Sequence, residues 1–217
     1  MLHQYHFFAA SAGYLIGSLP FGYLVARTYG VDIMKVGSCN PGATNVKRVV
    51  GGVAGNMVFL LDCLKGASAV SWIWLLPAHE LNAVHLSLIG LVGAVLGHSF
   101  SIFLRFNGGK GVATTLGGRV TLMPMSALIA VVVWLGLFFL TRYVSLASIG
   151  LAVVLPVSRF ILEGADILMG FATLVAVFIV VRHRSNIQRL IDGRENRFER
   201  PNKKRTQHES TRRKQND

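Results

Sequence analysis

The stretch GVATTLGGRVTLMPMSALIAVVVWLGLFFLT, residues 111–141, decides how this chain folds. It is thirty-one residues long, whereas one membrane-spanning helix needs only about twenty. Pro124 interrupts it, and both a proline and the residue before it disfavour a continuous helix. We therefore expect two helices, a short one at 111–123 and a second at 125–141. A helix of thirteen residues covers only about 20 Å, so the first must be sheltered by neighbours or lie where the bilayer is thinned.

The rest of the chain has the composition of a polytopic membrane protein. Of its 217 residues 52% are hydrophobic and only 15% are charged, with a mean hydropathy of +0.50, whereas soluble domains carry about 25% charged residues. Other apolar runs long enough to cross a bilayer lie at about 5–26, 53–76, 84–104, 146–162 and 167–182. No Lys or Arg precedes the first run, so we expect a retained helix rather than a signal peptide. With the two helices of 111–141, the sequence predicts an all-α bundle of seven transmembrane helices.

The charges predict the orientation of this bundle. The net charge is +12, and residues 182–217 hold twelve of the 22 Lys and Arg against five acids. The loop at 27–52 is also basic, whereas the loop at 77–83 has Glu80 and no Lys or Arg. Basic loops favour the cytoplasm, so the N-terminus should lie outside and the C-terminus inside, which agrees with seven crossings.

The C-terminal tail, residues 201–217, is basic and polar. We expect it to be disordered and to lie over anionic lipid, with residues 1–200 as a single membrane domain. This interpretation explains the positive charge, so we expect no nucleic acid as a partner. RNA binding by the tail is the alternative interpretation.

The first polar motif is VGSCNPGATNVKR, residues 36–48. Glycines followed by a helix start near Ala43 free successive backbone N–H groups for an anion, and Arg48 can grip a phosphate with two hydrogen bonds. The alternative is an ordinary polar loop, but few loops concentrate so many donors. The candidate side chains and glycine are Ser38, Asn40, Gly42, Thr44, Asn45 and Arg48.

The second motif, GHSFSIFLRFNGGKGVATT, residues 97–115, carries Lys110 between Gly108, Gly109 and Gly111. It does not match the P-loop pattern. A lysine at a helix end often reaches to the membrane surface, but the glycines let backbone and ammonium approach one ligand at a helix N-terminus. We expect Lys110 to bind a phosphate. His98 is a candidate for substrate contact, with helix packing as an equal alternative.

Two later segments contribute further polar residues. In RYVSLAS, 142–148, Ser145 and Ser148 are candidates, and helix capping is the alternative for either one. In RHRSNIQRLIDGRENR, 182–197, His183 and Asn186 share a helix face, and Arg189 and Glu195 follow.

An amphipathic interfacial helix would explain the same pattern in 182–197. His183 is the best general-base candidate by residue type, without an identifiable carboxylate partner. Asp62 and Lys65, three residues apart in an apolar span, are expected to pair with each other at or near the site.

These motifs resemble those of a known family. SCNPGATNVKR, GHSFSIFLRFNGGKGVAT and HRSNIQRLIDGRE look like the three cytoplasmic motifs of the PlsY family, bacterial membrane acyltransferases that use acyl phosphate as donor. The resemblance runs from about residue 13 to 196. It implies a seven-helix bundle in the inner membrane whose site faces the cytoplasm, acylation of glycerol 3-phosphate to 1-acyl-glycerol 3-phosphate, and release of phosphate.

By this resemblance the family's functional positions are Ser38, Asn40, Thr44, Asn45, Arg48, Lys110 with its flanking glycines, His183, Asn186, and either Ser145 or Ser148. One residue departs from the pattern: Cys39 stands where the family usually has glycine. If that position needs a positive φ, Cys39 is strained or the turn differs.

The implied reaction needs no covalent nucleophile, because acyl phosphate is already activated; alignment and charge stabilisation suffice. The proton acceptor is either His183 or a substrate phosphate. We expect no cofactor or metal, membrane lipids as surroundings, and a monomer. No histidine has Asp five residues on, so the motif of the other acyltransferase class is absent. The competing interpretation is a transporter or channel for an organic anion, and a scaffold without catalysis would leave residues 36–48 unexplained.

Overall fold

The structure is a computed structural model that describes residues 2–75 and 83–198, and every regular element in this part of the chain is a helix. The loop expected at 77–82, with Glu80, and the tail 201–217 lie outside the described residues. The α-helices are α1 Leu2–Ser18, α2 Phe21–Thr28, α3 Ala43–Val49, α4 Gly52–Ser71, α5 Ala83–Ser99, α6 Val112–Leu122, α7 Pro124–Thr141, α8 Val144–Glu163, α9 Ile167–Arg182 and α10 Arg184–Ile191. Two short 3₁₀-helices, Trp72–Leu75 and Ile102–Leu104, follow α4 and α5.

The decisive stretch is split as the sequence predicts. α6 ends at Leu122 and α7 begins at Pro124, the first residue of the new helix. A proline is tolerated there because the first N–H groups of a helix have no intrahelical partner. α6 has eleven residues, about 16 Å of helix. It contacts α4, α5 and α7, which supply the shelter that so short a helix requires.

The predicted span at 5–26 is found as Gln4–Thr28, but it is not one continuous helix. The chain breaks between α1 and α2 at Leu19 and Pro20, because proline cannot donate the next backbone hydrogen bond. Side chains from other segments fill the gap: Lys65 Nζ of α4 donates to the Leu19 carbonyl at 3.0 Å, and Ser101 Oγ, from the loop after α5, donates to the Ser18 carbonyl at 2.6 Å. The predicted span 84–104 is found as Ala83–Leu104, in which α5 stops at Ser99 and the 3₁₀-helix Ile102–Leu104 follows.

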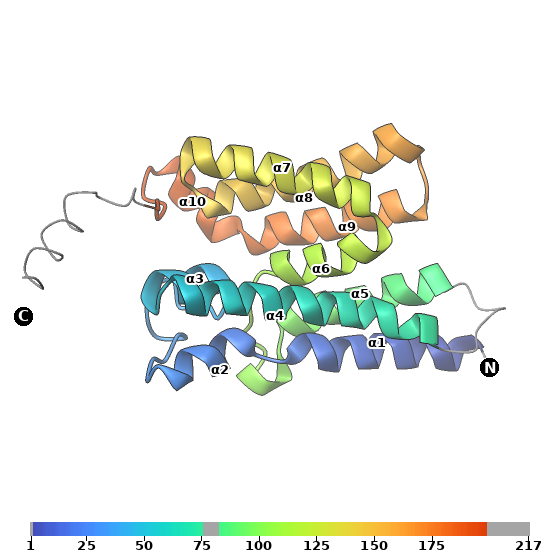
Figure 1. The fold of residues 1–217 in the computed structure, drawn as a ribbon, viewed down its shortest axis with the longest axis horizontal. Coiled ribbons are helices and arrows are strands. Elements are labelled where there is room, and N and C mark those ends of the chain that lie inside the picture. Colours follow the sequence, from blue (N-terminus) through green and yellow to red (C-terminus); the bar gives the residue numbers. More distant parts are fainter. Residues whose placement is uncertain (1, 76–82, 199–217) are drawn as a thin grey trace, which may run out of the picture.

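The helices form two groups with α6 between them (Figure 1). α1 packs along α5 and α4 in the first group, and α7, α8 and α9 pack together in the second. α1 and α5 approach through small residues: a Cβ added to Gly17 would lie 2.1 Å from the carbonyl oxygen of Ala94. Small residues of this kind let the backbones of membrane helices come close.

An apolar cluster joins the two groups. Leu91 and Val95 of α5 pack with Val175 and Ile179 of α9, and Met123 lies in the same cluster. In sequence these residues precede the C-terminal end of α5 or of α9. The cluster therefore fills part of the seam, the interface between the two helix groups. The part of this interface next to α3 and α10 is lined by other residues.

Within the described residues, five helical segments are long and apolar enough to cross a membrane: Gln4–Thr28, Gly52–Trp74, Ala83–Leu104, Pro124–Thr141 and Val144–Glu163. A sixth is obtained if α9 and α10, which meet at a bend of 58°, are counted together. The all-helical membrane architecture is thus confirmed, whereas the count of seven stays a prediction. α3 and α10 lie at the same end of the bundle (Figure 1), opposite the start of α1.

Candidate active site

A cavity of about 480 Å³ opens between the two helix groups at the end that carries α3 and α10. Fifteen of the seventeen candidate residues line it: Ser38, Asn40, Gly42, Thr44, Asn45, Arg48, His98, Lys110, Gly111, Ser145, Ser148, His183, Asn186, Arg189 and Glu195. The four polar segments of the sequence therefore meet at one place. Gly108 and Gly109, the other two candidates, are not among the lining residues.

The first loop is built around Asn45, which is buried. Its side-chain oxygen accepts a hydrogen bond from the backbone N–H of Ser38 at 2.9 Å, and its amide nitrogen donates to the carbonyls of Val36 and Asn40, both at 3.0 Å. These bonds occupy both ends of the Asn45 amide. We infer that Asn45 shapes the loop, whereas Ser38 and Arg48 are left to face the cavity.

Cys39 has φ 52° and its side chain is exposed. This is the left-handed region, in which only glycine is unstrained. Cys39 thus has the positive φ on which the expectation depended, and its backbone is strained.

Lys110 lies at the centre of the site. Its Nζ donates to Asn186 Oδ1 at 2.5 Å, so the second and third motifs are joined directly. Burial lowers the pKa of Lys110 from 10.5 to about 8, and the nearby arginines act in the same direction against the opposite effect of Glu195. Gly111 (φ 82°) follows Lys110 as the N-cap of α6, which begins at Val112.

Glu195 connects the serine segment to α10. Its Oε1 accepts from Ser145 Oγ at 2.9 Å and from Asn186 Nδ2 at 2.7 Å, and its Oε2 accepts from Arg189 Nε at 2.8 Å. Burial raises the pKa of Glu195, but the hydrogen bonds from Asn186, Arg189 and Ser145 outweigh it and lower the pKa overall. Glu195 is therefore an anion that orients its neighbours, and its charge makes it a poor direct ligand for a phosphate.

His183 is buried at the junction of α9 and α10. Its Nδ1 lies 2.8 Å from the carbonyl oxygen of Ile179. Because a carbonyl can only accept, Nδ1 carries the proton and Nε2 of the neutral ring is free to accept one. The partner that fixes the ring is thus a backbone carbonyl, which no carboxylate search in the sequence would find.

Ser148 and Arg48 also line the cavity, and each is held by an aromatic side chain. Ser148 Oγ accepts from Trp134 Nε1 at 3.3 Å, which leaves its own hydroxyl proton to donate. Arg48 lies over the ring of Phe198 at 5.7 Å, so its planar group is oriented before any ligand binds.

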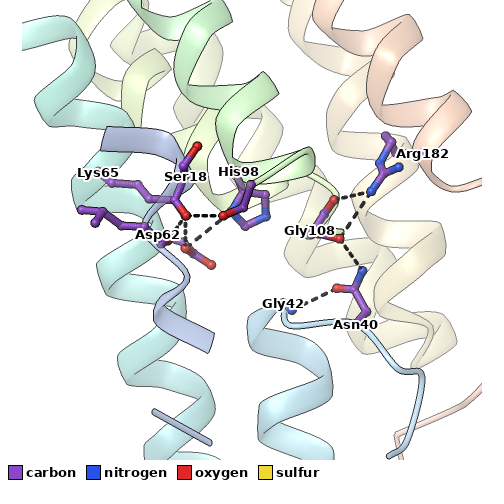
Figure 2. A network of polar contacts seen from close by, with 11 residues as sticks. Ser18, Asn40, Gly42, Asp62, Lys65, His98, Gly108 and Arg182 are labelled. Carbon is purple, nitrogen blue, oxygen red and sulfur yellow. Dashed lines mark hydrogen bonds and ion pairs between the residues drawn. The ribbon is translucent and has the colours of Figure 1, made fainter. Parts of the chain in front are cut away.

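Asp62, Lys65 and His98 form a buried cluster behind the loop (Figure 2). The predicted pair is confirmed, with Lys65 Nζ 2.8 Å from Asp62 Oδ1. His98 Nδ1 lies 3.6 Å from the same carboxylate oxygen. Asp62 and His98 also line the cavity, so the pair lies next to the site as expected, and both alternatives for His98, packing and substrate contact, remain compatible with its place.

Gly109 shows why glycine precedes Lys110. A Cβ at this position would lie 2.0 Å from His98 Nε2, so only glycine allows the loop to pack on the imidazole. The backbone N–H of Gly109 also donates to the His98 carbonyl at 3.0 Å. Gly108 and Gly109 therefore place Lys110 without lining the cavity themselves.

Two features of the site were missed in the sequence. The first is Arg182, whose guanidinium contacts the carbonyls of the glycine loop (Figure 2). The second is an apolar wall, supplied mostly by α7. Its members include Phe59, Leu116, Val131, Trp134, Leu135, Phe138, Phe139 and Leu151. The spacing 131, 134, 135 and 138 marks one helix face, but α7 is apolar all round, so nothing distinguishes this face from one that meets lipid.

Within residues 2–75 and 83–198, no group of three or more His, Cys, Asp or Glu side chains is placed to hold a metal ion. The polar groups that line the described site are cations, hydroxyls, amides, carboxylates and the imidazoles of His98 and His183.

Comparison with known proteins places this geometry in a family. A family model described as glycerol-3-phosphate acyltransferase matches residues 7–193. Glycerol-3-phosphate acyltransferases of Geobacter sulfurreducens and Desulforamulus reducens are 44% and 47% identical to the chain. These matches cover 87% and 84% of this chain and 95% and 90% of the relatives.

Two crystal structures of PlsY, an integral membrane glycerol 3-phosphate acyltransferase, have the same fold. The glycerol 3-phosphate form and the lysophosphatidic acid form superpose with TM-scores of 0.82 and 0.80, each at 39% identity over 89% of this chain. They are covered over 96% and 95% of their own length. The chain therefore belongs to the glycerol-3-phosphate acyltransferase family and is an integral membrane protein.

Proposed function

We propose that this protein transfers a fatty acyl group from acyl phosphate to the sn-1 hydroxyl of glycerol 3-phosphate, giving 1-acyl-glycerol 3-phosphate and phosphate, the first step of phospholipid synthesis. The observation that carries the proposal is one cavity whose cationic end, Arg48 and Lys110, adjoins an apolar wall that includes Trp134 and Phe138. A donor with an apolar chain and an anionic head fits such a cavity, as does an anionic acceptor. Membership of the family favours this reaction over anion transport.

The two cations have the first role. Both substrates carry phosphate, and the cations that line the cavity include Lys110, which is partly buried, and Arg48, which is exposed. They neutralise the phosphates, and preorganised donors of this kind stabilise the charge that develops on the carbonyl oxygen and the leaving group. Asn186 holds the Lys110 ammonium in place.

The bond changes are those of a direct acyl transfer. The sn-1 oxygen forms a bond to the acyl carbon, the bond from that carbon to the phosphate oxygen breaks, and the phosphate leaves with its electron pair. We assign the proton of the hydroxyl to Nε2 of His183, because the Ile179 carbonyl fixes the ring with Nδ1 protonated. A positioned base of this type contributes about a hundredfold or more to rate.

The other candidates divide into two roles. Asn40, Asn45 and Glu195 build the site, since their polar atoms bond to its own loops. Ser38 and Ser148 contact the substrates. We also propose that the enzyme acts as a monomer, since its own candidate residues, among them Ser38, Lys110 and His183, meet in one cavity.

The decisive experiment is acyl transfer by the purified protein from palmitoyl phosphate to labelled glycerol 3-phosphate, with acyl-CoA and acyl-carrier protein as parallel donors. We expect turnover with the acyl phosphate alone. Lys110→Met should lose about a hundredfold or more in rate. Its control, Lys35→Met, removes an exposed lysine that pairs only peripherally with Asp32 and should leave the rate within twofold. Turnover with acyl-CoA instead of acyl phosphate would overturn the proposal.

We further propose seven membrane segments, α6 included, in the inner membrane, with the N-terminus outside and the site facing the cytoplasm. The basic loop 27–52 and the basic residues after Arg182 support this orientation. Cys39 is exposed and Cys63 is not. A membrane-impermeant maleimide should therefore label Cys39 in inside-out vesicles and leave it unlabelled in right-side-out vesicles. The reverse pattern would invert the topology.

We also propose that residues 1–200 form a single membrane-embedded acyltransferase domain and that 201–217 form a separate tail. Truncation after residue 200 should leave the rate unchanged and reduce retention on anionic vesicles. A truncated chain that cannot turn over palmitoyl phosphate would show that the tail belongs to the enzyme.

A further inference from the structure

Arg182 has a side chain that the proposed reaction does not use. Its Nη2 donates to the carbonyl oxygen of Gly109 at 2.9 Å and lies 3.4 Å from the carbonyl oxygens of Gly108 and Ser99 (Figure 2). Its guanidinium also lies over the ring of Phe100, 5.1 Å from the centroid. One cation thus contacts the segments on both sides of the loop that leads to Lys110.

The position of Arg182 on the helix matters as much as its contacts. It is the last residue of α9, and after a bend of 58° Asn186 follows in α10. Arg182 holds the backbone of the glycine loop, while Asn186 accepts a hydrogen bond from the Lys110 ammonium at 2.5 Å. Both ends of the Lys110 residue, backbone and charge, are therefore fixed by the same helical junction.

The contacts also decide which way the loop faces. The carbonyl of Gly108 accepts from both Arg182 and Asn40 (Figure 2). A carbonyl oxygen carries partial negative charge, and it would repel a phosphate if it pointed into the cavity. By binding these carbonyls, Arg182 keeps the negative ends of the loop dipoles behind Lys110, whose ammonium lines the cavity.

We propose that Arg182 is a positioning residue for the acyl transfer: its guanidinium orients the glycine loop 108–111 so that the Lys110 ammonium meets the substrate phosphate. The inference rests on the proposed function for its kinetic consequence, whereas its effect on Lys110 itself is independent of that function. An arginine suits this role because the rigid guanidinium plane fixes the direction of its N–H groups, and here one nitrogen, Nη2, contacts all three carbonyl oxygens. A lysine at the same place would keep the charge and lose this fixed direction.

The substitutions Arg182→Lys and Arg182→Met separate orientation from charge. Both should lower kcat by about tenfold to a hundredfold, because a displacement of about 1 Å at a reacting group costs that much. The matched control, Arg105→Met, removes an arginine whose side chain is exposed five residues before Lys110 and should keep kcat within twofold.

A second readout follows Lys110 directly, by competitive amine labelling and mass spectrometry across pH. The charged and titratable groups that act on Lys110 are Glu195, Arg189, Arg182, Arg48 and His183. The positive charge of Arg182 lowers the pKa of Lys110. Arg182→Met should therefore raise the pH at which Lys110 becomes reactive, whereas Arg182→Lys and Arg105→Met should leave it in place.

The outcomes are distinct. Reduced kcat in Arg182→Lys with unchanged Lys110 titration supports the positioning role, and it decides the matter even if Arg182→Met does not fold. Wild-type kcat and KM in Arg182→Lys would overturn it, because charge alone would then suffice. If the unmodified protein fails to use palmitoyl phosphate, the proposed reaction is wrong, but an upward shift of Lys110 reactivity in Arg182→Met would still support the contact between the two residues.

Discussion

Cys39→Gly offers the sharpest test of the loop geometry. Cys39 holds a left-handed backbone at φ 52°, which costs a non-glycine residue about 1–2 kcal/mol. Glycine removes that strain but adds freedom to the unfolded chain, which opposes the gain by about 0.4–1 kcal/mol. The side chain is exposed, so little packing is lost. The net expectation is a stabilisation of about 0.5–1 kcal/mol.

In a chain of this size 1 kcal/mol moves Tm by roughly 2–4 °C, so Cys39→Gly should raise Tm by about 1–4 °C. Melting would be followed by tryptophan fluorescence in nanodiscs of one lipid composition at one scan rate, since membrane proteins often unfold irreversibly. Two further variants isolate the cause. Cys39→Ala removes the thiol but keeps Cβ, so its Tm should equal that of the unmodified protein, and the branched Cys39→Val should melt lower.

Equal Tm values for Cys39→Gly and Cys39→Ala would refute the reasoning, because the strain would then be absent or relaxed elsewhere. Acyl transfer by Cys39→Gly should stay within about twofold, since the turn around Ser38 and Asn40 already has the shape that glycine prefers.

Three other predictions address charge and proton transfer. The pKa of Lys110 is lowered to about 8, so its charge is present below that pH and lost above it. The value of kcat/KM measured across pH should therefore fall to about a tenth by one unit above the pKa. A flat profile to pH 10 would contradict the role of the Lys110 charge. His183→Gln should lower kcat by about a hundredfold; an unchanged kcat in the same assay would mean that the leaving phosphate takes the proton. Lys65→Met leaves the Asp62 carboxylate buried and unpaired, which should cost about 3–5 kcal/mol and lower Tm, and the double variant with Asp62→Asn should recover part of the loss. No recovery would show that the two side chains are not coupled.

Much of the fold follows from local rules that act on the chain before it packs. The split at Pro124 and the helix start after Gly111 are both confirmed, because proline and glycine act through their own backbones. Yet the rule that proline interrupts a helix would also have predicted the break at Pro20 between α1 and α2. The same rule would have predicted a break at Pro156, which does not occur. α8 continues through Pro156, so packing against neighbouring helices decides whether a proline ends a helix.

Site residues could be predicted where the sequence concentrates hydrogen-bond donors. Residues whose role is to bind backbone carbonyls could not be predicted, because the sequence does not show which carbonyls lie near them. Lys110 stands out because glycines surround it, whereas Arg182 has the appearance of any cation at the end of a span. Asn45 belongs to the predicted set, but its role is to shape the loop, and only the structure shows that its amide is fully bonded. The face of α7 that lines the cavity has no polar residue opposite it, so no periodicity could reveal it.

The seam between the two helix groups has a consequence for how a bound acyl chain packs. Leu91, Val95, Val175 and Ile179 fill one length of the seam, while the length beside α3 and α10 holds the cavity. An acyl chain lying against Trp134 and Phe138 would fill that second length and touch both groups at once. The acyl chain would thus complete the apolar interface between the two groups, and each catalytic cycle would empty and refill this part of the interface.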